Sequence, residues 1–447
     1  MTFSPAILAE SLSQLKDIAG QPARLVIAYS GGLDSTVLAH ALSSLKRDRE
    51  YFAQTPVVAI HIDHRLQPES LIWSEHCAES AAALGIEFQS FSVTVQLESG
   101  KGPEASARDA RYAALHARLQ SGDWLLSAHH REDQAETLLL NLIRGSGPAG
   151  VAGIGEVRRF APGWLARPML NVNRSDILQY AIDHDLKWVE DPSNTDRRFD
   201  RNFLRHEVLS RLRSRWPDIA ARLQRSASHA GEASQLLLEL AEIDRAALGA
   251  CSGRLPIDGL LALSQARRRN VIRFALRDQG LSTPTTLQLQ RIMTEVILAR
   301  EDAQPLVSWP GGSVRRYRNG LYLLPENLAD AVKTASLQDN QLDLGAGLGR
   351  LILETGANTG VSDALIRGGL CIRPREGGEE IQPVGQRHTR KLKKLLQEEG
   401  VVPWMRDRLP LIYAGERLVA VGDLWLANDA VASPGAAVRW IGRPALH

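Results

Sequence analysis

An apolar run that leads directly into a glycine turn and a helical pattern is the strongest constraint in this sequence. Residues 25–28 are Leu-Val-Ile-Ala, residues 30–32 are Ser-Gly-Gly, and Asp34 opens the pattern Asp-Ser-Thr-Val-Leu-Ala. A buried strand, a tight turn and a helix N-terminus in this order form a cradle for anions. The glycines let the backbone approach a ligand closely, and the free amides and the helix dipole attract phosphate. The segment therefore predicts a phosphate-binding loop at the end of a strand.

Two common phosphate-binding loops do not match this segment. A Walker loop needs a lysine directly before its Ser or Thr, whereas Asp34 stands before Ser35. A dinucleotide-binding loop needs a third glycine, which is missing here. The segment is therefore either a different kind of phosphate-binding loop or an ordinary turn between a strand and a helix.

The first part of the chain alternates strand and helix patterns, which is typical of a parallel sheet. This alternation predicts βαβ units and an α/β fold, a doubly wound parallel sheet with helices on both faces. Ligands bind such sheets at the carboxyl ends of the strands. The predicted strands lie at 25–29, 57–63, 88–95 and 124–129, and the predicted helices at 35–46, 70–84, 104–120 and 134–144.

The rest of the chain changes character twice. Helical patterns dominate after residue 200, with a break at Trp216-Pro217, and Asn319-Gly320 between alternating residues predicts a hairpin. Short strand patterns and one basic helix at 390–399 end the chain. We expect a catalytic domain at 1–215, a mainly helical domain at 216–335, a linker at 336–365 and a small α+β domain at 366–447.

Composition fits a cytoplasmic protein without membrane association. The apolar fraction is 44%, and the net charge of +2 means that any nucleic-acid binding must come from local basic patches. Cys77, Cys251 and Cys371 are far apart, so they suggest neither a metal site nor a disulfide framework. The sequence shows no signal-peptide pattern and no apolar run of the ~20 residues that span a bilayer.

A second group of polar side chains follows the predicted strand 124–129. If Asp133 opens a helix, Asp133 and Glu136 share one face of it. These two carboxylates, with His129 and His130 before them, suit a cationic ligand, a metal or proton transfer. The alternative is helix capping, with Asp133 as the cap and Glu136 three residues on.

The loop and this group together resemble a known family. Ser-Gly-Gly-x-Asp-Ser resembles the pyrophosphate (PP) loop of ATP pyrophosphatases, and further blocks resemble the tRNA(Ile)-lysidine synthetases, in their long form with two C-terminal domains. The departures are small, such as Arg131-Glu132 where the family usually has an apolar residue and Asp. The matching blocks include Ile62-Asp63-His64-Arg65-Leu66, Arg108 with Arg111-Tyr112, His129-His130, Asp133-Gln134, Glu136-Thr137, Arg167-Pro168, Arg201-Asn202-Phe203-Leu204-Arg205, Arg390-Lys391-Leu392-Lys393-Lys394 and Pro403-Trp404-Met405.

The resemblance implies a tRNA-modifying ligase. The family uses ATP to adenylate the wobble cytidine of the isoleucine tRNA with a CAU anticodon, which releases pyrophosphate. The amine of free L-lysine then displaces AMP and forms lysidine. ATP and Mg²⁺ are therefore the implied cofactors, this tRNA and L-lysine are the implied partners, and no stable protein partner is implied.

The resemblance also implies roles for individual residues. A carboxylate repels phosphate, so Asp34 is expected to hold Mg²⁺. Because the lysine amine has a free pKa of about 10.4, the site must bind a cation and then take its proton. Asp133 and Glu136 are expected to bind the amine, and one of them or His129 to act as the base. The implied ATP-binding residues are Ser30, Gly31, Gly32, Leu33, Asp34, Ser35, Thr36, Asp63 and His64.

Basic residues gather in four places. Residues 197–215 hold seven arginines against two acids, which favours a nucleic-acid surface over a solvated helix face. Four patches in separate regions suggest one long substrate that is held at several points, as a tRNA would be. The predicted tRNA contacts are Asn202, Arg205, Arg267, Arg268, Arg315, Arg316, Arg390, Lys391, Lys393 and Lys394.

Two other functions remain open. One is another PP-loop enzyme of tRNA modification, but a sulfur-inserting enzyme would usually carry a cysteine pair that this sequence lacks. The other is a tRNA-binding scaffold with an inactive ATP loop. The presence of Asp34, Asp133 and Glu136 argues against this scaffold.

Overall fold

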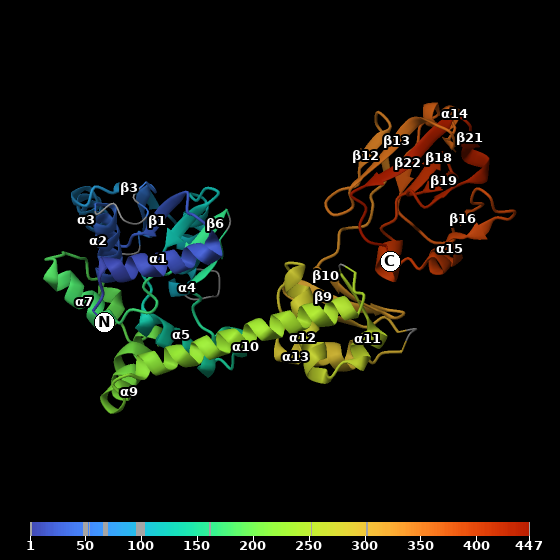
Figure 1. Cartoon of the computed structure of the whole chain (residues 1–447). Helices are drawn as coiled ribbons and strands as arrows, with labels where there is room; N and C mark the ends of the chain where they lie inside the picture. The colour runs from blue at the N-terminus through green and yellow to red at the C-terminus, as the bar shows by residue number, and fades with distance from the viewer. Residues whose placement is uncertain are drawn as a thin grey trace. The chain divides into compact units, whose positions relative to one another are not determined.

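The protein forms two compact units, Met1–Leu236 and Leu237–His447, each with its own hydrophobic core (Figure 1). Two predicted features extend outside the described residues: Leu66 ends the family block that starts at Ile62, and Val95 ends the predicted strand 88–95. The computed structural model describes residues 2–47, 52, 54–65, 70–94, 103–160, 162–251, 253–300 and 303–446.

The first unit is built on a six-stranded sheet with the strand order β3-β2-β1-β4-β6-β5. All neighbouring strands are parallel except β5 and β6, which form an antiparallel edge. This order confirms the predicted α/β fold, although β5 and β6 were not predicted. The strands are β1 (Arg24–Ala28), β2 (Val57–Asp63), β3 (Glu87–Ser92), β4 (Asp123–Leu126), β5 (Val157–Phe160) and β6 (Gly163–Ala166).

Helices cover both faces of this sheet. Successive side chains of a strand point to opposite faces, so one strand contributes to a core on each side. Leu25 and Ile27 of β1 belong to the core that contains α1, α2, α3 and α7, whereas Val26 packs in a second core with Leu115 of α4. A strand that is buried on both faces reads as a continuous apolar run, as residues 25–28 do. The helices are α1 (Pro5–Ala19), α2 (Leu33–Arg47), α3 (Ser70–Ala83), α4 (Pro103–His116), α5 (Arg131–Ile143), α6 (Pro148–Val151) and α7 (Arg174–Asp183).

The strand order reverses its direction between β1 and β4. The connection from β1 leads to β2 on one side, and β4 pairs with β1 on the other side. In open α/β sheets, ligands bind outside the carboxyl ends of the strands at such a switch point. The segments that follow β1 and β4 carry the phosphate loop and the histidine–carboxylate group of the sequence.

Short helical segments complete the first unit and lead into a long helix. Pro217 has no N–H to donate, and the helical path breaks at Trp216-Pro217 as predicted. Leu209 and Ala220 pack with Ala135 of α5 in a small core, so the segments that follow residue 199 lie against α5. These elements are η2 (Pro192–Thr195), α8 (Asp200–Phe203), the π-helical turn η3 (Leu204–Val208), α9 (Leu209–Arg215) and α10 (Ile219–Ala247).

The second unit begins with helices packed on a four-stranded sheet, β7-β10-β9-β8. The hairpin predicted at Asn319-Gly320 is confirmed, since β9 and β10 pair directly around it. Val271 and Ile292 are among the fully buried side chains of this core. The elements are β7 (Arg254–Pro256), α11 (Ile257–Ala262), α12 (Gln265–Asp278), α13 (Thr286–Arg291), η4 (Ile292–Val296), β8 (Leu306–Trp309), β9 (Gly312–Tyr317) and β10 (Gly320–Leu324).

The remainder of the second unit is a small α+β fold with two five-stranded sheets. One sheet holds β11 (Ala335–Ser336), β15 (Cys371–Arg373), β18 (Leu411–Ala414), β19 (Arg417–Val421) and β20 (Trp425–Leu426). The other holds β12 (Gln341–Asp343), β13 (Arg350–Ala357), β14 (Gly360–Val361), β21 (Val431–Ala432) and β22 (Gly435–Ile441). The remaining elements are α14 (Asp363–Arg367), β16 (Glu380–Ile381), β17 (Arg390–Lys391), α15 (Leu392–Glu399), α16 (Pro403–Arg406) and η5 (Asn428–Ala430).

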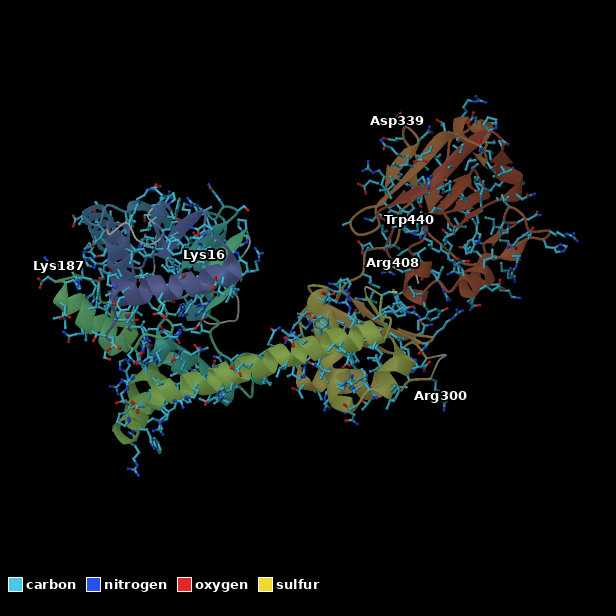
Figure 2. The ribbon with its side chains drawn as sticks, viewed as in Figure 1. Lys16, Lys187, Arg300, Asp339, Arg408 and Trp440 are labelled. Atoms are coloured by element: carbon cyan, nitrogen blue, oxygen red, sulfur yellow. The ribbon has the colours of Figure 1, made fainter. Side chains whose placement is uncertain are left out.

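The expected linker at 336–365 is instead part of this fold. β13 pairs with β22, and Leu351 and Leu353 are buried in the shared core. Figure 2 labels Trp440 of β22. Its indole N–H donates a hydrogen bond to the carbonyl of Leu348, at 2.6 Å. The prediction was wrong because the partner strand of β13 lies far along the chain, and a short alternating run does not reveal such a partner.

Among the described residues, no helix combines the length and the apolar character that crossing a bilayer requires.

The core of the first unit supports a stability prediction. Leu126 in β4 is 0% exposed, and replacing such a leucine by alanine destabilises a protein by about 2–5 kcal/mol. We expect Leu126→Ala to speed amide hydrogen exchange in β1 and β4, about tenfold for every 1.4 kcal/mol lost. Ile143→Ala is the control, because Ile143 is 73% exposed. Equal exchange rates in the two variants would contradict this account of the core.

Candidate active site

The phosphate loop has a shape that only glycine allows at its tightest point. Gly31 has a φ of +76°, and a Cβ built on it would lie 2.6 Å from the Sγ of the buried Cys77. The carbonyl of Gly31 accepts a hydrogen bond from the N–H of Val189, at 2.9 Å. Backbone conformation, a close neighbour and an anchoring hydrogen bond therefore fix the path of the loop.

Three hydroxyl groups hold the loop from within. Ser30 Oγ lies 3.1 Å from Ser35 Oγ, and Ser35 donates to the carbonyl of Gly32 at 3.0 Å. Thr36 donates to the carbonyl of Gly31 at 3.4 Å. The helix α2 starts directly after this turn, at Leu33. The structure thus brings together the residues that the sequence predicted for phosphate binding, at the N-terminus of a helix.

Asp34 has an oxygen that is not used by the protein. Its Oδ1 is buried and has no hydrogen-bond partner among the residues that the structure describes, whereas its Oδ2 lies 3.8 Å from His130 Nε2. Burial raises the pKa of this carboxyl, and the charge of Asp133 acts in the same direction, while His130 lowers it. A bound cation would compensate for both effects.

This orphaned oxygen fits Mg²⁺ as the residues stand. Mg²⁺ in nucleotide sites is usually bound by one or two carboxylates together with phosphate oxygens and water. In the part of the chain that the structure describes, no group of three or more His, Cys, Asp or Glu side chains could hold a metal by itself. Asp34 would therefore share the ion with the phosphates of a nucleotide.

His130 connects the loop to the carboxylates of α5, and the sequence prediction gave it no separate role. Its side chain is 1% exposed, its Nε2 lies 3.5 Å from Asp133 Oδ2, and its Nδ1 lies 3.2 Å from Glu132 Oε2. Burial disfavours the charged imidazole, but the surrounding carboxylates of Asp133, Glu132 and Asp34 raise the pKa of His130 above its ordinary value. The His-His pair in the sequence was the available signal, but it did not show which ring lies between the carboxylates.

Asp133 and Glu136 lie side by side, and both pair with arginines. Glu136 is 0% exposed. Its carboxylate accepts hydrogen bonds from Arg201 Nε at 2.7 Å and from Arg205 Nε at 2.6 Å. Asp133 Oδ1 accepts from Arg201 Nη2 at 2.8 Å. Although burial would raise the pKa of Asp133, His130 and Arg201 hold it below its ordinary value. The structure therefore places Arg205, predicted as a tRNA contact, inside the carboxylate cluster.

Helix capping and the charged cluster are both present at this point. The residue that caps α5 is His130, not Asp133 as the alternative interpretation had it. Asp133 lies in the first turn and accepts the backbone N–H of His130 on Oδ2, at 2.9 Å. Its other oxygen faces Arg201, so one carboxylate serves both purposes.

His129 is half-buried beside the carboxylate cluster. Its Nδ1 lies 2.7 Å from the hydroxyl of Ser127. Burial lowers the pKa of His129 to about 3, although Asp133 acts in the opposite direction. An imidazole with this pKa is a weaker proton acceptor than a free histidine.

Asp63 and His64 stand at the end of β2, which neighbours β1. Asp63 Oδ1 accepts the backbone N–H of Arg65 at 2.8 Å, so this oxygen shapes the turn. His64 Nδ1 is buried, and no group in the described part of the chain forms a hydrogen bond with it. Burial lowers the pKa of this histidine. His64 therefore has a ring nitrogen that a nucleoside could engage.

Several residues predicted to contact tRNA have other partners in the structure. Arg316 is buried, and its Nη1 donates to the carbonyls of Ile297 and Ala299, both at 2.6 Å. Arg268 donates to the carbonyls of Leu260, Leu261 and Leu263. These guanidinium groups hold the ends of helical segments, a structural role that the sequence did not predict.

The other predicted contacts fall into two groups. Arg267 pairs with the buried Asp244, Arg315 lies over the ring of Trp404, and Asn202 donates to the carbonyl of Asp196. Arg390 pairs with Glu398 at 2.5 Å. In contrast, Lys391, Lys393 and Lys394 on and before α15 are exposed. These three lysines are the predicted contacts that best keep the character of a phosphate-binding surface.

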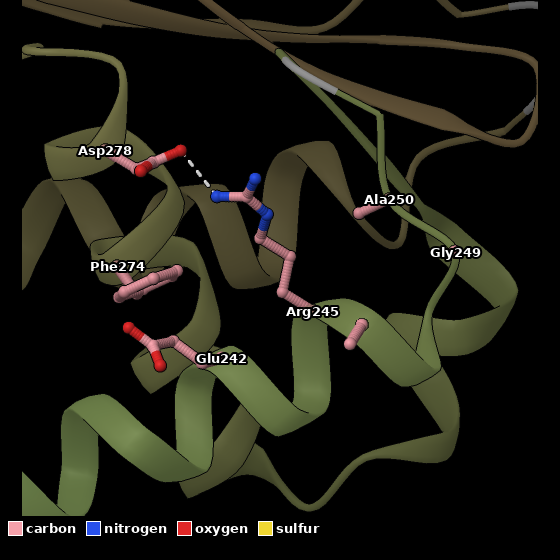
Figure 3. Close-up of a pocket in the computed structure, with 7 residues that line it drawn as sticks. Glu242, Arg245, Gly249, Ala250, Phe274 and Asp278 are labelled. Carbon is pink, nitrogen blue, oxygen red and sulfur yellow. Dashed lines mark hydrogen bonds and ion pairs between the residues drawn. The ribbon is translucent and has the colours of Figure 1, made fainter.

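A cavity in the second unit does not coincide with any of these residues. Its volume is about 470 Å³, and its lining includes Glu242 and Arg245 from α10 and Phe274 and Asp278 from α12 (Figure 3). Arg245 and Asp278 form an ion pair of 2.5 Å across it. Two acids against one arginine make this lining unsuitable for a nucleotide phosphate, so the candidate site is the group of residues after β1 and β4 in the first unit.

Comparison with known proteins agrees with this placement. A PP-loop domain family matches residues 6–212, a TilS substrate binding domain matches residues 255–322, and a TilS substrate C-terminal domain matches residues 370–440. The tRNA(Ile)-lysidine synthase of Alkalilimnicola ehrlichii is 42% identical over 97% of both chains. The enzyme of the same name from Coxiella burnetii is 42% identical over 88% of this chain and 87% of its own. That from Pectobacterium atrosepticum is 42% identical over 91% of each. The chain therefore belongs to the tRNA(Ile)-lysidine synthase family.

Proposed function

We propose that this protein is an ATP-dependent ligase that converts the wobble cytidine of the isoleucine tRNA with a CAU anticodon to lysidine. The observation that carries the proposal is the unpartnered Oδ1 of Asp34 beside a phosphate loop, next to a cluster of charged side chains. A scaffold with an inactive loop would have no use for such an oxygen. A cytoplasmic location is part of the proposal.

The phosphate loop would bind the ATP. The backbone N–H groups of Gly31, Gly32 and the start of α2 would donate hydrogen bonds to phosphate oxygens. The serine and threonine hydroxyls keep the loop in shape. Mg²⁺ held by Asp34 and phosphate oxygens would neutralise the charge of the departing pyrophosphate. His64, with its unpartnered ring nitrogen, is available to the nucleoside.

The carboxylate cluster would bind the lysine. Asp133 has a side chain that is 12% exposed, whereas Glu136 is inaccessible behind Arg201 and Arg205. Asp133 is therefore the carboxylate that a lysine amine reaches first, and Glu136 acts by holding the two arginines. Their guanidinium groups are partly exposed and suit the carboxylate of the same amino acid.

The surroundings of the cysteines argue against the alternative function, a sulfur-inserting PP-loop enzyme. Cys77 is buried under the phosphate loop, and burial raises the pKa of its thiol to about 12. Cys251 is exposed and Cys371 is partly buried, and both belong to the second unit. A sulfur-transfer reaction needs a reactive thiolate, which Cys77 does not supply, so the ligase reaction is favoured.

The direct test is to incubate the protein with ATP, radiolabelled L-lysine and total tRNA. We expect label in the isoleucine tRNA with a CAU anticodon, and equal amounts of AMP and lysidine. Pyrophosphate release without incorporation of lysine would favour another PP-loop modification enzyme. A protein that binds tRNA but releases no pyrophosphate would be the inactive scaffold.

The first prediction concerns Asp34. Asp34→Asn keeps the size of the side chain but removes the charge that would bind Mg²⁺. We expect pyrophosphate release to fall more than about 100-fold, since removal of a group that stabilises transition-state charge costs on this scale. The thermal unfolding midpoint should stay near that of the wild type. Near-normal AMP formation by a folded variant would exclude this role.

The second prediction separates the two substrates. Asp133→Asn keeps an oxygen that can accept the N–H of His130 but loses the charge for the lysine amine. The KM for lysine should rise about tenfold or more, as expected for a charged hydrogen bond worth ~1.5–3 kcal/mol, while the KM for ATP changes little. Equal effects on both substrates would instead indicate that Asp133 serves mainly as the helix cap.

The third prediction concerns Lys391, Lys393 and Lys394. Replacing all three by alanine should weaken tRNA binding and flatten its salt dependence, by up to about one unit of slope per lost contact. The KM values for ATP and lysine should hardly move. The matched control replaces three exposed lysines of the first unit, Lys16, Lys46 and Lys187, which changes the net charge equally. If both triple variants lose the same affinity, the effect is one of total charge and the predicted contact is absent.

A further inference from the structure

Glu132 is a largely buried carboxylate to which the proposed reaction assigns no role. It lies in the first turn of α5, and its Oε2 accepts the backbone N–H of Arg174 at 2.9 Å. The other oxygen, Oε1, lies 3.2 Å from Nη2 of Arg213. Two elements, the start of α7 and the helix α9, therefore fix the position of this side chain.

The fixed carboxylate faces one side of a buried imidazole. Glu132 Oε2 lies 3.2 Å from Nδ1 of His130, and the opposite nitrogen, Nε2, lies 3.5 Å from Asp133 and 3.8 Å from Asp34. The ring is rigid, so a partner on one nitrogen sets the direction of the other. Because His130 is 1% exposed, water cannot easily take the place of a lost partner.

The direction of this ring matters to the phosphate loop. Asp34 and Asp133 carry like charges, and Asp133 disfavours the charged form of Asp34. His130 Nε2 faces both carboxylates and offsets their repulsion. A ring turned away would leave the two carboxylates to repel each other, and Asp34 would no longer be held toward the loop.

We propose that Glu132 is a positioning residue for the phosphate loop. Its charge lies 3.2 Å from Nδ1 of His130, as an ion pair without hydrogen-bond geometry. This attraction keeps Nε2 beside Asp34, so that the buried oxygen of Asp34 stays directed at the place where Mg²⁺ and the ATP phosphates would bind. The proposal deepens the proposed function and rests on one part of it, namely that ATP with Mg²⁺ is the ligand of the loop. The competing explanation is that Glu132 only stabilises the first turn of α5 and the ion pair with Arg213, which is a structural role.

ATP binding to the full-length protein, measured by calorimetry, separates the two explanations. We expect Glu132→Ala to weaken ATP binding about 10- to 100-fold in excess Mg²⁺, the range seen when the partner of a metal-site histidine is lost. ATP binding in EDTA should equal that of the wild type. Glu10→Ala, which removes an exposed glutamate of α1, is the control and should change neither value. Unchanged affinity in Mg²⁺, or equal loss with and without Mg²⁺, would overturn the proposal.

A double-mutant cycle shows whether Glu132 acts through His130. In a His130→Asn background the ring is absent, so Glu132→Ala should cause no further loss of Mg²⁺-dependent ATP affinity. Additive losses would overturn the proposal. Lysidine formation by the wild type is scored separately. If the wild type forms lysidine and Glu132→Ala binds ATP normally, only the positioning role is rejected. Wild-type protein that binds ATP with Mg²⁺ but makes no lysidine rejects the proposed reaction alone.

Discussion

The pairing of β1 with β2 on one side and β4 on the other is the interaction on which the site depends. Leu25 lies opposite Val57 in β2 and Trp124 in β4, so parts of the sequence about a hundred residues apart end at the same edge of the sheet. The backbone hydrogen bonds of this register bring the glycine loop after β1 next to the N-terminus of α5 after β4. A shift of one residue would reverse which side chains face each core, and it would also separate Asp34 from His130.

The sequence predicted this edge well because its signals are local. The glycine turn, the apolar run before it and the acidic helix start after it lie within twelve residues, at positions 25–36. The partners of the carboxylates were not predictable in the same way. Arg201 and Arg205 reach Glu136 across 65 and 69 residues, and only the packing of the segments after residue 199 against α5 creates these pairs. The pairing of β13 with β22 is another long-range contact, which explains why residues 336–365 were mistaken for a linker.

Counting basic residues does not separate arginines with a structural role from lysines on a solvent-facing surface, and the reason lies in the side chains themselves. Arginine has five N–H donors in a fixed fork, so it is well suited to the free carbonyls at helix ends, where Arg268 and Arg316 are found. Lysine has a single charged group on a flexible chain. On the amphipathic helix α15, Leu392, Leu395 and Leu396 are buried while the lysines remain exposed. Two short segments with the same net charge can therefore differ in role. In one, the basic side chains hold helix ends; in the other, they face solvent.

Charge is closely balanced at the site, and this balance distinguishes the two ligands. The carboxylates of Asp34, Glu132, Asp133 and Glu136 face His130, Arg201, Arg205 and Arg213. Of these four carboxylates, only Asp34 has a buried oxygen for which the described ranges of the chain provide no partner. Under the proposed function, Mg²⁺ and a nucleotide would therefore bind at the loop without breaking an ion pair. Under the proposed function, a lysine amine would instead take an oxygen of Asp133 that Arg201 already holds, so lysine would displace or share an existing ion pair whereas ATP would not.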